Sequence, residues 1–118
     1  MSQVKITREE TREADHVFSA VLIEMENAYV VFLSEGEEKL GTLAVSLPQK
    51  PGMIGPPLSS VLLGERNATL ARLLAERLAK SSERMTLVSV FVKSVDERRA
   101  GHAFLGLLEK ILGKRESA

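Results

Sequence analysis

Residues 39–93 read KLGTLAVSLPQKPGMIGPPLSSVLLGERNATLARLLAERLAKSSERMTLVSVFVK, and this stretch decides the fold. It opens with a strand pattern at 39–47 and passes through a proline- and glycine-rich loop at 48–57. A helix is then predicted at 68–81 and a strand at 85–93. Because both faces of that last strand are apolar, we expect it in the middle of a sheet.

Three residues in this stretch have specific backbone roles. Gly41, on a strand, permits a bulge or the close approach of another backbone. Gly64 suits a turn that needs positive φ before a helix. Asn67 is the expected N-cap of that helix. Its buried face is indicated by an apolar stripe with four-residue spacing: Leu70, Leu74 and Leu78.

The preceding residues predict more strands. Residues 17–25 are apolar on both faces, as in a strand that is covered on two sides, and 29–33 form the next strand. Glu26 and Asn27 between them predict a tight hairpin in which Asn27 is left-handed. Residues 3–11 predict an edge strand, where lysine and arginine discourage unwanted pairing.

The last helix has capping-box spacing at Ser94 and Glu97, and Gly113 is a natural stop. Its apolar stripe is wider than a helix needs to pack on its own sheet. The excess would meet either the first helix within the subunit or the same helix of a second subunit. For the second case the predicted dimer-interface residues are Gly101, Phe104, Leu105, Leu108 and Leu112.

Together these elements predict one α+β domain spanning all 118 residues. We expect a largely antiparallel twisted sheet of five to six strands with two main helices, a proline-rich loop at 48–57, a short disordered tail at 114–118, and dimerisation. The chain has no cysteine, and its first residues form no hydrophobic run of signal-peptide length. We therefore expect a cytoplasmic protein that does not enter membranes.

Charge is distributed unevenly. Residues 1–65 hold 5 lysines and arginines against 10 acidic residues, and residues 66–118 hold 11 against 6, although the whole chain is neutral. If the halves face apart, such a molecule can steer a charged partner, but basic helix surfaces often serve only solvation. With two histidines and two aspartates, no catalytic or metal site is indicated. We expect no cofactor and no nucleic-acid partner.

The order and spacing of short sequence motifs in residues 39–93 resemble those of the proteasome assembly chaperone 3 family. The matching residues are Gly41, Thr42, Leu43, Leu62, Leu63, Gly64, Val92 and Lys93. The resemblance implies a small non-enzymatic α+β chaperone that works as a homodimer, or as a heterodimer with a related chaperone. Such a protein would bind proteasome α-subunits during assembly of the α-ring and leave when β-subunits join. Most of the matching residues look structural.

Partner contacts are predicted on exposed residues. The candidates are Lys93, Arg98 and Arg99 at the start of the last helix, and Met53 and Ile54 in the proline-rich loop. That loop is otherwise a plain connection. Other proteasome-binding chaperones and activators end in a hydrophobic residue, a tyrosine and one more residue, whereas this chain ends in Arg-Glu-Ser-Ala. The resemblance therefore favours a flat-surface contact over insertion of the tail into pockets of the α-ring.

Two other functions fit the same residues. One is a dimeric signalling scaffold of the roadblock or longin kind, and the other is a small-ligand-binding domain. A pocket that takes an apolar ligand would favour the ligand-binding domain, whereas a continuous exposed apolar patch would favour a scaffold or chaperone. The absence of cysteine and the abundant Glu, Lys and Arg would suit an archaeal or thermophilic source.

Overall fold

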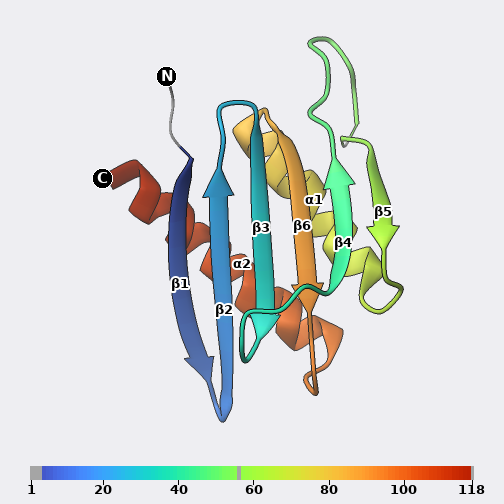
Figure 1. The fold of residues 1–118 in the computed structure, drawn as a ribbon. Coiled ribbons are helices and arrows are strands. Elements are labelled where there is room, and N and C mark those ends of the chain that lie inside the picture. Colours follow the sequence, from blue (N-terminus) through green and yellow to red (C-terminus); the bar gives the residue numbers. More distant parts are fainter. Residues whose placement is uncertain (1–3, 56, 118) are drawn as a thin grey trace.

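The computed structural model describes residues 4–55 and 57–117, and these form six strands and two helices (Figure 1). The elements follow one another as β1 (Lys5–Glu13), β2 (His16–Glu24), β3 (Ala28–Glu35), β4 (Thr42–Ser46), β5 (Ser59–Leu63), α1 (Ala68–Ser82), β6 (Met85–Phe91) and α2 (Glu97–Ser117). The predicted α+β fold with two main helices is confirmed. No helix among the described residues has both the length and the apolar character of a membrane span.

The six strands form one sheet in the order β1-β2-β3-β6-β4-β5. Every neighbouring pair is antiparallel except β3 and β6, which are parallel, so the sheet is largely antiparallel as predicted. β6 lies between β3 and β4 although these two strands are consecutive in the chain. The connection from β3 to β4 therefore crosses one end of β6 (Figure 1).

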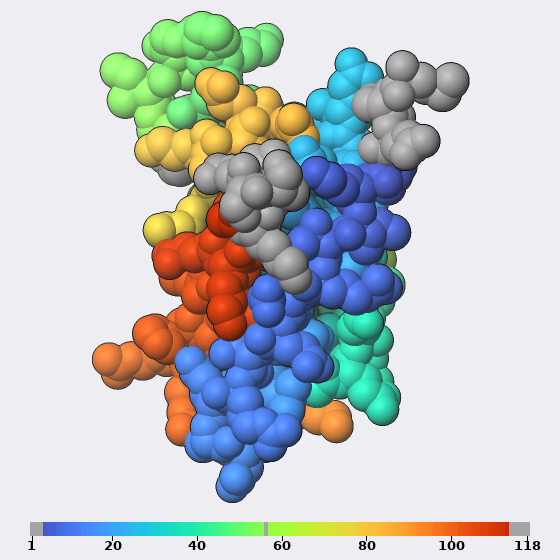
Figure 2. Space-filling view, turned by 90° about the vertical axis from the view of Figure 1, so that its left-hand side faces the viewer, coloured from blue at the N-terminus to red at the C-terminus, as the bar shows by residue number. Residues whose placement is uncertain are grey.

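Both helices cover the same face of the sheet, behind it in Figure 1. α1 packs on β4, β5 and β6, and α2 packs on β1 and β2. Phe18 of β2 and Phe104 of α2 meet edge to face, with ring centroids 5.6 Å apart. Burial of these apolar faces provides the main driving force for folding. Figure 2 shows α2 (red) on one side of the β1 edge (blue), with the teal β3–β4 connection on the other side.

The N-terminus of α1 is capped differently from the prediction. Asn67 holds the N-cap position, but it is left-handed (φ 62°) and its side chain makes no capping hydrogen bond. Glu97 of the other helix supplies the acceptor instead, because its Oε1 receives the Leu70 amide at 3.2 Å. A glutamate of α2 thus satisfies one of the free amides that begin α1.

The predicted capping box of α2 is also wrong. The helix begins at Glu97, and the carboxylate of Asp96 accepts the Arg99 amide at 2.8 Å. Asp96 therefore acts as the N-cap. Ser94, the predicted cap, donates its hydroxyl to Glu35 on β3 instead.

Two turn predictions are corrected as well. In the hairpin between β2 and β3 the Met25 amide donates to the Ala28 carbonyl at 2.8 Å, and Asn27 does not have positive φ. At the other end of the chain, α2 continues through Gly113 to Ser117, so Gly113 is not its stop. Residues 114–117, which were predicted as a disordered tail, therefore belong to α2. Residue 118 lies outside the described residues.

Candidate functional site: two apolar surfaces

The sheet face away from the helices is apolar over much of its area, with polar side chains mainly on β1, and we refer to it as the open face. The strand registers align one row of residues across all six strands, with apolar residues on the first five. The row runs Ile6, Ile23, Val30, Leu87, Val45 and Ser60. A second row is mixed and runs Arg8, Val21, Phe32, Ser89 and Leu43, with Val21 and Ser89 buried. Apolar residues that gather in this way on one face are typical of a protein interface.

Exposure differs across the open face. Ile6 is 53% exposed, whereas Ile23, Val30, Leu87 and Val45 are partly exposed. The strand 17–25 was expected to be covered on two sides, but the described helices cover only one. On the second face of β2, Val17 and Ile23 are therefore partly open to another molecule, whereas Ser19 and Val21 are buried within the chain.

One end of the open face is covered by the β3–β4 connection. Gly41 donates its amide to Ser89 Oγ at 2.8 Å, and a β-carbon at Gly41 would lie 2.1 Å from the Val90 carbonyl oxygen. The predicted close approach of another backbone is confirmed. Lys39 of the same connection lies over the Phe91 ring, 5.2 Å from its centroid. Glycine is required at position 41 because any side chain there would collide with β6.

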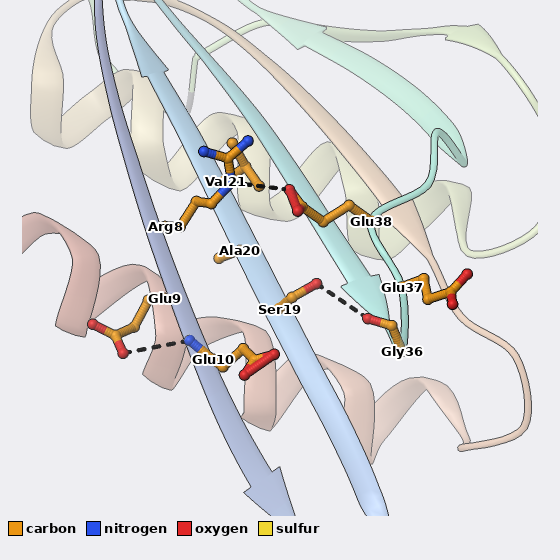
Figure 3. Close-up of a pocket in the computed structure, with 9 residues that line it drawn as sticks. All are labelled: Arg8, Glu9, Glu10, Ser19, Ala20, Val21, Gly36, Glu37 and Glu38. Carbon is orange, nitrogen blue, oxygen red and sulfur yellow. Dashed lines mark hydrogen bonds and ion pairs between the residues drawn. The ribbon is translucent and has the colours of Figure 1, made fainter.

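An acidic pocket of about 550 Å³ lies between this connection and the β1–β2 hairpin (Figure 3). Figure 3 shows Arg8 directed towards Glu38, with Nε and Oε2 3.4 Å apart. Ser19 donates to the Gly36 carbonyl at 3.3 Å. The lining contains four glutamates and one arginine: Arg8, Glu9, Glu10, Glu37 and Glu38. Such an open, charged lining differs from the apolar enclosure that small-ligand sites normally have.

Hydrogen bonds to the Glu35 side chain connect the end of β3 to the segment just before α2. Its Oε1 accepts the amides of Lys93, Ser94 and Val95 at 2.9, 3.0 and 3.2 Å, and its Oε2 accepts the Ser94 hydroxyl at 2.8 Å. Burial by itself would raise the pKa of Glu35. The hydrogen bonds from Ser94, Val95 and Lys93 outweigh that effect and lower the pKa to about 2. His16 Nδ1 lies 3.3 Å from Oε2.

A second apolar surface lies on the helix side, and we call it the α1 groove. It encloses about 620 Å³ and has four leucines in its lining: Leu70, Leu73, Leu74 and Leu105. Leu73 is 58% exposed. Gly55 and Pro57 of the proline-rich loop and Leu105 of α2 also line it. Arg77 and Lys80 add positive charge at the rim.

The predicted partner-contacting residues are exposed but not gathered in one place. Arg98 and Arg99 lie in the first turn of α2, and Lys93 lies in the connection before it, where its carbonyl accepts Arg66 Nη2 at 3.1 Å. Met53 is 57% exposed and Ile54 99% exposed in the proline-rich loop. Their role in partner binding stays a prediction.

The predicted dimer-interface residues divide into two groups. Phe104 and Leu108 are buried against the sheet, where they belong to the subunit core. Gly101, Leu105 and Leu112 are partly exposed, and a β-carbon at Gly101 would lie 3.2 Å from Leu70 Cδ1 of α1. The wide stripe of α2 thus serves the core and the contact with α1, and a role in dimerisation stays a prediction for the exposed members.

Two of the matching residues proposed as structural, Gly64 and Thr42, lie against each other. Gly64 has φ 89°, as predicted, and a β-carbon there would lie 2.7 Å from Thr42 Oγ1. Thr42 donates its hydroxyl to the Arg66 carbonyl. Val92 is buried. Three further matching residues are partly or largely exposed: Leu43, Leu62 and Leu63.

The open face and the α1 groove were not identified from the sequence as surfaces. The signal for the open face was present in the two-faced apolar pattern of β2 and β6, which predicts cover on both sides. The groove depends on how the proline-rich loop folds back beside α1, and no periodicity in the sequence indicates that contact.

Sequence and fold comparisons relate this chain to known proteins. The family model of proteasome assembly chaperone 4 matches residues 18–92. A solved structure described as a novel chaperone complex for yeast 20S proteasome assembly is similar in fold, with a TM-score of 0.68 and 16% identity. That similarity covers 97% of this chain and 96% of the yeast-complex chain. Comparison with curated protein sequences gave no match.

Proposed function

Because this chain belongs to the proteasome assembly chaperone 4 family, we propose that it helps assemble the proteasome core particle by binding α-subunits, without catalysing a reaction. The predicted resemblance was to the chaperone 3 family, whereas the matching family model is that of chaperone 4. The broader prediction of a proteasome assembly chaperone is confirmed. Binding to the α-ring and departure when β-subunits join are parts of the proposal.

The open face is the observation that carries the proposal. An apolar row across five strands would be costly to leave in water, and a second protein surface can remove it from water. We propose that a second sheet, from another copy or from a related chaperone, packs on this face. Aligned sheets pack about 10 Å apart with interdigitating side chains, which suits partly exposed residues of medium size.

Native mass spectrometry tests the function directly. The purified protein is mixed with free proteasome α-subunits from the same organism, and β-subunits are added afterwards. We expect a complex that contains two chaperone chains, and we expect it to disappear when β-subunits join. No association with α-subunits at micromolar concentration and low salt would refute the proposed function.

A matched pair of variants tests the sheet interface. Leu87→Glu places a charge at the centre of the apolar row, whereas Ser60→Glu places one at its exposed end. We expect Leu87→Glu to weaken chaperone pairing at least about tenfold, because burying an unpaired charge is costly. Ser60→Glu should pair nearly as wild type. Circular dichroism verifies that both variants fold, and equal pairing by both would contradict a sheet-to-sheet contact.

A further inference from the structure

The α1 groove combines apolar lining with a positive rim. Leu70, Leu73, Leu74 and Arg77 follow one another at helical spacing, so they form a single stripe along α1. Leu70 and Leu74 are buried at the base of this stripe, and Leu73 is largely exposed. The stripe therefore offers an apolar strip, and Gly55, Pro57 and Leu105 from outside α1 line the groove with it.

The charges around the groove are predominantly positive. Within the described parts of the chain, neither Arg77 nor Lys80 forms an ion pair. Glu76, the one acidic residue in the lining, accepts the Ser59 hydroxyl. Residues 68–82 of α1 and residues 97–110 of α2 together contain six lysines and arginines and three glutamates. The acidic pocket described above borders the opposite face of the sheet.

We propose that the α1 groove is the docking site for an acidic amphipathic helix of the proteasome α-subunit that the chaperone binds. This inference rests on the proposed function. The apolar residues of that helix would cover Leu73 and the leucines beneath it, and its carboxylates would face Arg77 and Lys80. Helix-in-groove recognition uses apolar anchors at the same three- and four-residue spacing as this stripe. The chaperone would then use two opposite faces, the open face for a chaperone partner and the groove for its client.

Charge complementarity selects this occupant. A helix with a basic flank would meet uncompensated like charges at Arg77 and Lys80, which opposes docking. A purely apolar helix would gain nothing from those two residues. An acidic flank gains from both, and its association rate would fall as salt screens the attraction.

Three variants test the groove. Leu73→Gln removes the apolar contact without adding charge, and Lys80→Glu reverses one rim charge. Lys110→Glu makes the same charge change on α2, outside the groove lining. Chaperone pairing is measured by light scattering, and binding to free α-subunits from the same organism is measured by fluorescence anisotropy at several salt concentrations.

We expect Leu73→Gln and Lys80→Glu to weaken α-subunit binding about tenfold each while pairing stays unchanged. Lys80→Glu should also reduce the salt dependence, and Lys110→Glu should bind within about twofold of wild type. Wild-type binding that both groove variants retain would overturn the groove assignment and leave the proposed function intact. Loss of pairing instead of α-subunit binding would make the groove a contact between chaperones and overturn the assignment. A wild-type protein that binds no α-subunit would overturn the proposed function and the groove assignment together.

Discussion

Replacement of Glu35 by glutamine should destabilise the protein at neutral pH but hardly at all at very low pH. The glutamine keeps an oxygen that can accept the amides of Lys93, Ser94 and Val95, so the substitution mainly removes the negative charge. The charged carboxylate is favoured in the folded protein because four hydrogen bonds point at it. The stabilisation due to charge therefore disappears when the carboxylate becomes protonated.

The magnitude follows from the pKa. The pKa of Glu35 falls from 4.5 to about 2 on folding, because the hydrogen bonds outweigh burial. At about 1.4 kcal/mol per pKa unit, this shift corresponds to an upper limit of about 3.5 kcal/mol in the free energy of unfolding. The glutamine amide retains part of the hydrogen bonding, which offsets some of this loss, so we expect ~2 kcal/mol. Because the folded pKa is depressed, this stabilisation is fully present above pH 4.5 and is lost as the pH falls towards 2.

Urea denaturation of both proteins at several pH values between 7 and 2 measures the difference. We expect Glu35→Gln to be less stable than wild type at pH 7 and nearly equal to it at pH 2. Glu37→Gln is the control, because Glu37 is exposed in the neighbouring connection, and its effect should stay within about 0.5 kcal/mol. A difference between wild type and Glu35→Gln that is the same at pH 7 and pH 3 would refute the reasoning.

Three further substitutions test other contacts. Gly41→Ala should lower the free energy of unfolding by at least ~3 kcal/mol or prevent folding, because the added β-carbon collides with the Val90 carbonyl; thermal denaturation measures the loss, and a wild-type melting temperature would contradict it. Phe104→Ala should cost ~3–5 kcal/mol in urea denaturation by opening a core cavity, and a loss that depends on protein concentration would instead indicate an interface role. Glu97→Ala should cost about 1 kcal/mol by leaving the Leu70 amide without its acceptor, and Glu97→Gln should recover most of that stability, whereas equal losses in both would contradict the capping role.

The strands and helices were predictable because they depend on local periodicity. β6 was correctly placed in the middle of the sheet from its two apolar faces, and the helix at 68–81 differs from α1 by a single residue at its end. Backbone positions that need glycine were also predictable, since Gly41 and Gly64 have the close contact and the positive φ expected of them.

The helix caps were not predictable because they depend on tertiary contacts. Glu97 is close enough in sequence to pair with Ser94, but α2 brings it to the amide of Leu70 instead. Ser94 in turn donates its hydroxyl to Glu35, which is distant in sequence. Both alternatives satisfy the same kind of free backbone amide, so local spacing alone does not distinguish them.

The candidate surfaces were only partly predictable. Exposure of Met53, Ile54 and the arginines of α2 follows from their polar or loop surroundings. The placement of a groove beside α1 depends on the path of the proline-rich loop, and the open face depends on both helices covering the same side of the sheet. The spacing of apolar residues within a single helix or strand predicts neither arrangement.

The position of β6 also determines when the sheet can close during synthesis. β1, β2 and β3 can pair as hairpins as they emerge from the ribosome, and β4 and β5 can form another hairpin. The two groups have no common edge until residues 85–91 enter between β3 and β4, because β6 pairs with both. Such late, long-range pairing slows folding and leaves apolar strand edges temporarily unprotected. A nascent chain that stops before β6 would therefore hold two separate half-sheets, and the chaperone itself would need protection until its last quarter is made.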